Sequence, residues 1–350
     1  MRASHSNSPL SSRPAASRRH ALQLLLVTAA SWGFGAALAQ PAGVPGGSPK
    51  PAQPLQQLRI GYQKSAVNLV VAKQSGWLEQ RWPNARIAWV EFPAGPQLLE
   101  ALAVGSLDFG LTGDTPPVFA QAAGRDLLYV GAEPSKPDSS AVLVLDDSPL
   151  KSLADLRGRK VALQKGSSAH YLLVRAVDKA GLQWSDIQPV YLAPADARAA
   201  FERRSVDAWA IWDPYYAATE LAIRPRVLAS GRGLSGNNSF YLASSAFAQR
   251  HPDVIAALFE ALTRADRLVQ QDRATAVKLI AGFGGLDAGV VSLFLQRRPP
   301  SPVGPIQPAT VRDQQRVADA FHRIGLLPQP IDVARIVWHP AAAPRTVNPS

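Results

Sequence analysis

The chain of 350 residues contains no cysteine and only one methionine. Without a thiol it can form no disulfide and no thiolate metal site, and it offers no cysteine for a lipid anchor. Its stability must therefore come from an apolar core. Hydrophobic residues make up 47% of the sequence, which is enough to build a large core.

Acidic residues are absent from the first 39 positions, which carry four arginines and an apolar run from Ala21. Ala37-Leu38-Ala39 then supplies the small residues at which signal peptidase cuts. A membrane anchor would need about 20 consecutive apolar residues. We therefore predict a signal peptide over residues 1–39, cleaved near Ala39, and a periplasmic mature protein. Ser17-Arg18-Arg19 is similar to a twin-arginine signal, so both the Sec and the twin-arginine routes stay open.

Large charge clusters are also missing. Removing the four leader arginines from 37 basic residues leaves 33 against 26 acidic ones, a net charge of +7. The basic residues do not alternate with aromatic residues, which argues against nucleic acid and favours a small anionic ligand. The six histidines show no metal-ligand spacing, so we predict no metal and no cofactor. No serine has the setting of a nucleophile, and we predict no enzymatic activity.

Residues 40–57 are rich in proline, glycine and alanine and predict a flexible leader. From Leu58 onward, strand and helix patterns alternate, which predicts an α/β fold with parallel sheets. The expected order is a first lobe over 58–142, a second lobe over 143–234, a return to the first lobe over 235–339, and a disordered tail over 340–350. A single helix is expected over Asn68–Gln80, and the last helices begin near Asp253, Asp272 and Thr310.

Two strand-to-helix turns are candidate anion sites, because helix amino termini present unpaired backbone N–H groups. The first turn runs from Gly110 to Pro117, with Thr115 as the expected helix cap. The second runs from Leu163 to Tyr171, with Ser168 as the expected cap. Turns of this kind also occur in α/β proteins that bind no anion.

Six segments, in this order, resemble the aliphatic-sulfonate-binding proteins of ABC importers. They are Ile60–Lys64, Glu91–Glu100, Gly113–Gln121, Gly166–Leu173, Asp186–Leu192 and Trp209–Tyr216. The resemblance implies the type II periplasmic-binding-protein fold, in which two α/β lobes joined by two crossover strands enclose a ligand cleft. It implies a monomer that captures an alkanesulfonate and delivers it to an ABC permease for sulfur uptake.

The resemblance also implies the binding residues. The expected set is Gln63, Asp114, Thr115, Ser167, Ser168, Ala169, His170, Trp212, Asp213 and Tyr216. Since a sulfonate carries one charge, we expect neutral donors at helix starts to hold it without a lysine or arginine. Trp212 is either a wall for the alkyl tail or a core residue. Asp213 either braces the turn at Pro214 or selects ligands that carry an amine.

Related cargoes for the same fold are taurine, nitrate and aromatic sulfonates. A rival of another class is an enzyme similar to the pyrimidine-precursor synthases, which share the fold and consume a bound cofactor. Those enzymes use a cysteine-rich iron site, and this chain has no cysteine. A binding protein is therefore the preferred interpretation.

Overall fold

The computed structural model describes residues 54–340. The predicted signal peptide, most of the predicted leader and all but the first residue of the predicted tail lie outside this range. None of the described helices combines the length and the apolarity that are needed to cross a membrane.

The first sheet has the strand order β2-β1-β3-β10-β4. Its strands are β1 (Gln57–Tyr62), β2 (Arg86–Glu91), β3 (Phe109–Gly113), β4 (Leu128–Glu133) and β10 (Ser239–Ala243). The first three pair in parallel, whereas β10 runs antiparallel to both β3 and β4. The helices α1 (Val67–Gln74), α2 (Trp77–Arg81), α3 (Gly95–Ala103) and α4 (Thr115–Ala122) connect these strands. We call this sheet, with its helices, the first lobe.

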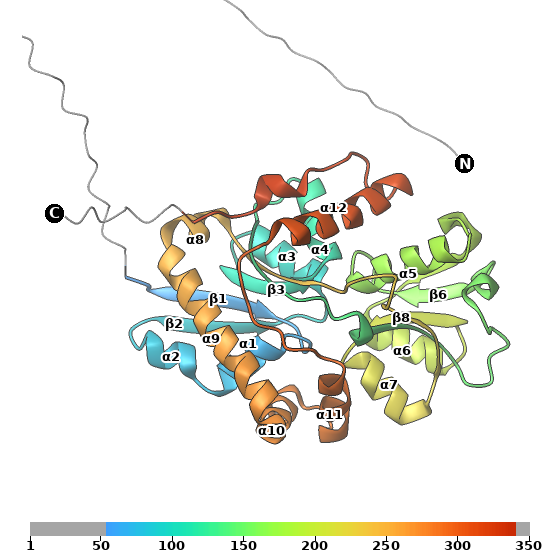
Figure 1. Ribbon diagram of the computed structural model, residues 1–350, viewed down its shortest axis with the longest axis horizontal. Coiled ribbons are helices and arrows are strands. Elements are labelled where there is room, and N and C mark those ends of the chain that lie inside the picture. The colour runs from blue at the N-terminus through green and yellow to red at the C-terminus, as the bar shows by residue number, and fades with distance from the viewer. Residues whose placement is uncertain (1–53, 341–350) are drawn as a thin grey trace, which may run out of the picture. The chain divides into compact units, whose positions relative to one another are not determined.

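The second sheet has the order β7-β6-β8-β5-β9. Its strands are β5 (Ser140–Val144), β6 (Lys160–Leu163), β7 (Gln188–Tyr191), β8 (Ala208–Trp212) and β9 (Arg226–Ser230). Here β6 pairs in parallel with β7 and β8, and β5 is antiparallel to its neighbours. The helices of this second lobe are α5 (Ser168–Lys179), α6 (Pro194–Glu202) and α7 (Tyr215–Ile223), with 3-10 turns at Leu153–Leu156 and Trp184–Asp186. Figure 1 shows the two lobes side by side.

The chain passes to the second sheet between Glu133 and Ser140, through the 3-10 turn Pro137–Ser139, and returns between Ser230 and Ser239. The predicted boundary after residue 142 thus falls inside β5, and the limits of the lobes stay a prediction. Each lobe packs its own core: Trp209 and Phe201 are fully buried in the second, and Phe109 and Tyr241 stack in the first.

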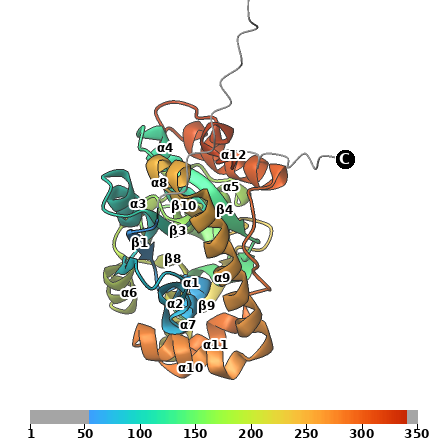
Figure 2. The same ribbon diagram turned by 90° about the vertical axis from the view of Figure 1, so that its left-hand side faces the viewer.

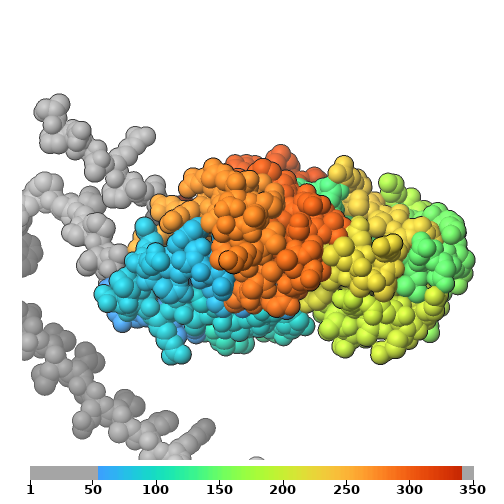
Figure 3. All heavy atoms as spheres, turned by 90° about the horizontal axis from the view of Figure 1, so that it is seen from below, coloured from blue at the N-terminus to red at the C-terminus, as the bar shows by residue number. Residues whose placement is uncertain are grey.

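The carboxyl-terminal helices cover the first lobe. They are α8 (Ser245–Arg250), α9 (Pro252–Gln271), α10 (Arg273–Gly284), α11 (Ala288–Gln296) and α12 (Pro308–Arg323), followed by the 3-10 turn Val333–Ile336. Helix α1 packs against α9 and α10, and these helices gather beside it in Figure 2. Helix α11 also contacts α7, and α12 contacts α5. The orange helices in Figure 3 accordingly lie between the blue part of the first lobe and the second lobe.

Three expectations about the elements were wrong. Both sheets are mixed rather than parallel, because the two crossing segments reverse the direction of the chain before β5 and β10. The single helix expected over Asn68–Gln80 is divided into α1 and α2 by Gly76, whose φ of 63° is incompatible with a continuous helix. Helices α7, α8 and α11 were not predicted. Both α7 and α11 carry residues of the candidate site or of its surroundings.

Candidate functional site

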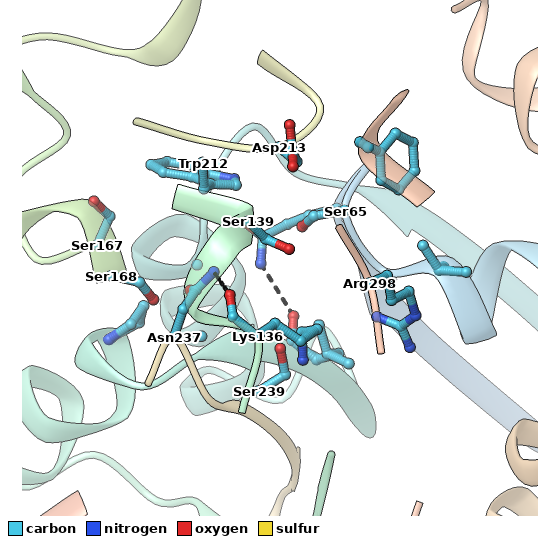
Figure 4. A pocket seen from close by; sticks show the side chains of 17 residues that line it. Ser65, Lys136, Ser139, Ser167, Ser168, Trp212, Asp213, Asn237, Ser239 and Arg298 are labelled. Atoms are coloured by element: carbon cyan, nitrogen blue, oxygen red, sulfur yellow. Dashed lines mark hydrogen bonds between the residues drawn. The ribbon is translucent and has the colours of Figure 1, made fainter. Parts of the chain in front are cut away.

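A partly open cavity of about 60 Å³ lies where the two lobes meet. Both lobes and both crossing segments contribute to its wall, and Figure 4 shows how the side chains converge. The polar residues of the wall are Gln63, Ser65, Lys136, Ser139, Ser167, Ser168, Asp213, Asn237, Ser239 and Arg298. Its apolar side is formed by Val67, Leu111, Pro116, Trp212 and Phe294, with Gly95 and Gly113.

The turn after β3 differs from the expected cap. The cap position is Asp114, and Thr115 is the first residue of α4. The Thr115 hydroxyl is fully buried and donates to Oδ1 of Asp114 at 3.0 Å, so it does not reach the cavity. The Asp114 carboxyl is also buried, and burial raises its pKa to about 6. It lies on the wall of a separate hollow that α5 and α12 also line.

The turn after β6 provides the opposing wall. Ser167 occupies the cap position of α5 without a capping hydrogen bond, and its hydroxyl donates to the carbonyl of Gln164 at 2.8 Å. Ser168 is the first helical residue, and its hydroxyl bonds to the Asp114 carboxyl of the other lobe. Both serines line the cavity. The prediction that Ser168 caps its helix was therefore wrong, because this hydroxyl has a tertiary partner.

The two lobes approach each other closely at Gly113. A Cβ atom built on this glycine would lie 1.9 Å from Oγ of Ser168 and 3.2 Å from its Cβ. Any side chain at position 113 would therefore collide with the second lobe. The lack of a side chain at Gly113 allows this approach. The φ angle of Gly113 is not positive, so the backbone conformation alone does not require glycine here.

The structure does not bring His170 or Ala169 to the cavity. The His170 ring is fully buried and packs among Phe119, Trp184, Tyr191 and Phe321. Its Nδ1 accepts from the N–H of Gly166 at 3.2 Å. Burial, assisted by the charge of Lys165, lowers the pKa of His170 to about 3, so the ring is neutral at physiological pH. Two residues after Ser168, the helix directs this ring into the core.

Trp212 and Asp213 end β8 at the cavity. The Oδ1 atom of Asp213 accepts from the N–H of Ala217 at 3.0 Å, which braces the first turn of α7. It also accepts from Arg297 at 3.1 Å, and Arg297 pairs with Glu220 as well. Burial raises the pKa of Asp213 to about 7, although Arg297 opposes this shift. The Arg297 guanidinium stacks on Tyr216 at 3.9 Å, and Tyr216 itself does not line the cavity.

Two buried cations, Lys136 and Arg298, line the cavity. Nζ of Lys136 lies 3.0 Å from Oε2 of Glu133, and Nη2 of Arg298 lies 3.2 Å from the same oxygen. Within residues 54–340, neither Nη2 nor Nε of Arg298 makes an aligned hydrogen bond. Nε of Arg298 therefore has no partner among these residues, whereas Nη2 is paired with Glu133. The expectation of a cleft lined only by neutral donors was wrong, because Lys136 and Arg298 are part of this wall. The sequence analysis missed both residues, since they lie in segments that it did not assign to the site.

Comparison with known proteins identifies the family of this chain. Residues 63–276 match the family described as NMT1/THI5 like. An aliphatic sulfonates-binding protein of Escherichia coli (strain K12) is 50% identical over 285 residues, which is 81% of this chain and 89% of that protein. This chain belongs to the aliphatic-sulfonate-binding proteins.

Two solved structures agree with this family assignment. One is the periplasmic aliphatic sulphonate binding protein SsuA from Escherichia coli, with a TM-score of 0.76 and 50% identity over 82% of this chain and 93% of that one. The other is the alkanesulfonate-binding protein SsuA from Xanthomonas axonopodis pv. citri bound to MOPS, with a TM-score of 0.78 and 50% identity over 83% and 99%. They confirm the predicted periplasmic-binding-protein fold. These relatives are all named as binding proteins, in line with the prediction that this family member is not an enzyme.

For this family member, the structure gathers half of the predicted site. Gln63, Ser167, Ser168, Trp212 and Asp213 line the cavity, whereas Asp114, Thr115, Ala169, His170 and Tyr216 are not part of its wall. Sequence reasoning missed Ser65, Lys136, Ser139, Asn237, Ser239 and Arg298. The sequence offered one local signal for Arg298, namely two consecutive arginines before Pro299-Pro300. Basic residues followed by proline are typical of the carboxyl end of a helix, but this pattern does not indicate a ligand site.

Proposed function

We propose that this chain is the periplasmic binding protein of an ABC importer and that it captures aliphatic sulfonates for uptake of their sulfur. The observation that carries the proposal is a buried arginine, Arg298, on the wall of a cavity that hydroxyl groups also line; its Nε has no partner within residues 54–340. The names of the proteins that are 50% identical to this chain support the same ligand class.

The wall divides into two parts that suit the two ends of such a ligand. Arg298, Lys136 and Ser239 offer donors for the three oxygens of a sulfonate. Trp212, Phe294, Leu111 and Val67 offer apolar surface for an alkyl group. Asp213 is the only carboxylate of this wall in the described residues, and Arg297 and Ala217 already occupy it. This wall therefore offers no unpaired carboxylate to the amine of taurine.

A thermal-shift screen tests this ligand class. The panel contains methanesulfonate to octanesulfonate, taurine, nitrate and sulfate. At 100 times its dissociation constant, a ligand stabilises the native state by about 2.7 kcal/mol. For a chain of this size, the melting temperature should rise by about 5 to 10 °C. A flat response to every sulfonate would refute the proposal.

We further propose export with cleavage near Ala39, action as a monomer, and delivery of the ligand to a transmembrane permease. The export proposal is supported by the name of the Escherichia coli structure, which is called periplasmic, and by the small residues of Ala37-Leu38-Ala39. Intact-mass measurement of protein from the periplasm should give a chain that starts at or near Gln40. A chain that retains residues 1–39 would contradict the proposed export.

A further inference from the structure

The two cations of the cavity share one carboxylate, that of Glu133 at the end of β4. Glu133 is 4% exposed and is not part of the cavity wall. Its Oε2 faces Lys136 and Arg298, while its Oε1 accepts from the Tyr241 hydroxyl at 2.8 Å and from Nδ2 of Asn68 at 3.1 Å. We call Glu133, Lys136 and Arg298 the charge cluster.

The acid of this cluster stays ionised. Although burial alone would raise the pKa of Glu133, the charges of Arg298 and Lys136 outweigh it and hold that pKa at about 2. Two hydrogen bonds from the first lobe fix the carboxylate from the side opposite to the cations. With two positive charges and one negative charge, the cluster has a net charge of +1. Asp213, the other charged group of the wall, pairs with Arg297, whose second partner, Glu220, is partly exposed to solvent. The nearby Asp114 carboxyl is outside this wall and bonds to Ser168 and Thr115.

A cavity whose charge cluster has a surplus of one positive charge is suited to one negative charge. A sulfonate brings the sum to zero, whereas sulfate leaves one negative charge buried without a partner. Such an uncompensated buried charge is costly. We propose that Glu133 is a specificity-determining residue that never touches the ligand: it cancels one of the two cations and so restricts the cavity to singly charged anions. This inference rests on the proposed function.

Four proteins test the inference by changing the charge of the cluster. Wild type carries +1, Glu133→Gln carries +2, Lys136→Met carries 0, and the double variant returns to +1. Ethanesulfonate and sulfate are titrated into each by calorimetry at pH 7.5. Glu202→Gln is the control, because Glu202 pairs with Arg198 on the surface of the second lobe and its substitution changes the total charge equally.

In Glu133→Gln, the affinity for sulfate relative to ethanesulfonate should rise about tenfold or more, since an extra buried charge acts over a few ångströms at low dielectric. Lys136→Met should weaken ethanesulfonate binding about tenfold or more, and adding Glu133→Gln to it should recover most of that loss. The control should behave as wild type does.

A sulfate-to-ethanesulfonate ratio in Glu133→Gln that equals that of wild type would overturn the inference. If Glu133→Gln does not fold, as circular dichroism would show, the comparison of Lys136→Met with the double variant decides, and equal ethanesulfonate affinities would overturn it. Failure of wild type to bind any sulfonate is a different result, which refutes the proposed function itself.

Discussion

Substitution of Gly113 by alanine should interfere with ligand capture more than with folding. The new methyl group would lie 1.9 Å from Oγ of Ser168, and the backbone of Gly113 otherwise accommodates alanine. Overpacking of this kind costs about 1 to 3 kcal/mol. Because the collision exists only where the lobes meet, that energy should appear in the binding of ethanesulfonate. The dissociation constant should therefore rise about 5- to 150-fold.

A double-variant cycle isolates this collision. Ser168→Ala removes the hydroxyl and leaves the closest approach at 3.2 Å, a distance that a small shift relieves. It should weaken binding by itself, because Ser168 lines the cavity and bonds to Asp114. In that background, Gly113→Ala should have little further effect. Gly282→Ala is the matched control, since no atom lies within 4 Å of its new methyl group.

Calorimetric titration with ethanesulfonate supplies the four dissociation constants, and urea unfolding without ligand reports stability. The expected pattern is a large loss of affinity in Gly113→Ala, a small change in its ligand-free stability, and strong coupling to Ser168. The same fold-loss from Gly113→Ala in both backgrounds would refute the reasoning. So would an affinity for Gly113→Ala equal to that of Gly282→Ala.

Two predictions concern pH. Because burial lowers the pKa of His170 to about 3, its ring stays neutral from pH 5.5 to 8, and His170→Gln should leave the pH profile of ethanesulfonate affinity unchanged in calorimetry. A gain of about tenfold per pH unit on acidification, seen only in wild type, would contradict this. Burial raises the pKa of Asp114 from 3.8 to about 6, so the stability that its protonated form contributes is present below pH 3.8 and is lost as the pH rises through 6. Asp114→Asn should therefore increase the free energy of unfolding in urea by about 3 kcal/mol at pH 7.5, from a shift of about two units, and by little at pH 4. Equal stabilities of variant and wild type at pH 7.5 would show that the charged carboxyl carries no penalty.

Local sequence patterns were sufficient to predict the cavity residues at the ends of two strands, β6 and β8. Ser167 and Ser168 come directly after β6 and the glycine turn at Gly166, whose φ is 72°. Trp212 and Asp213 likewise close β8. Strand ends converge at the same edge of such sheets, so order along the chain predicts that these residues meet.

The remaining residues of the site depend on contacts between segments that are far apart in the sequence, and no local pattern encodes such contacts. Glu133 and Arg298 are far apart in the sequence, and their pairing depends on the return of α11 to the first lobe. The hydroxyls of Thr115 and Ser168 matched a capping pattern but bond to Asp114 instead. His170 sits in a predicted anion turn, yet the helical rotation after Ser168 turns its ring into an aromatic core.

We propose above that Arg298 holds a sulfonate in the cavity between the lobes. Calorimetric titration of ethanesulfonate into wild type and Arg298→Met tests it most directly, with Arg264→Met as the control because Arg264 stacks on Trp77 at a different surface of the first lobe. Wild type and the control should bind one equivalent with equal affinity. In Arg298→Met the affinity should fall about 100-fold, as the loss of a charge-assisted contact of 2 to 3 kcal/mol predicts. Equal affinities of Arg298→Met and wild type would contradict the claim.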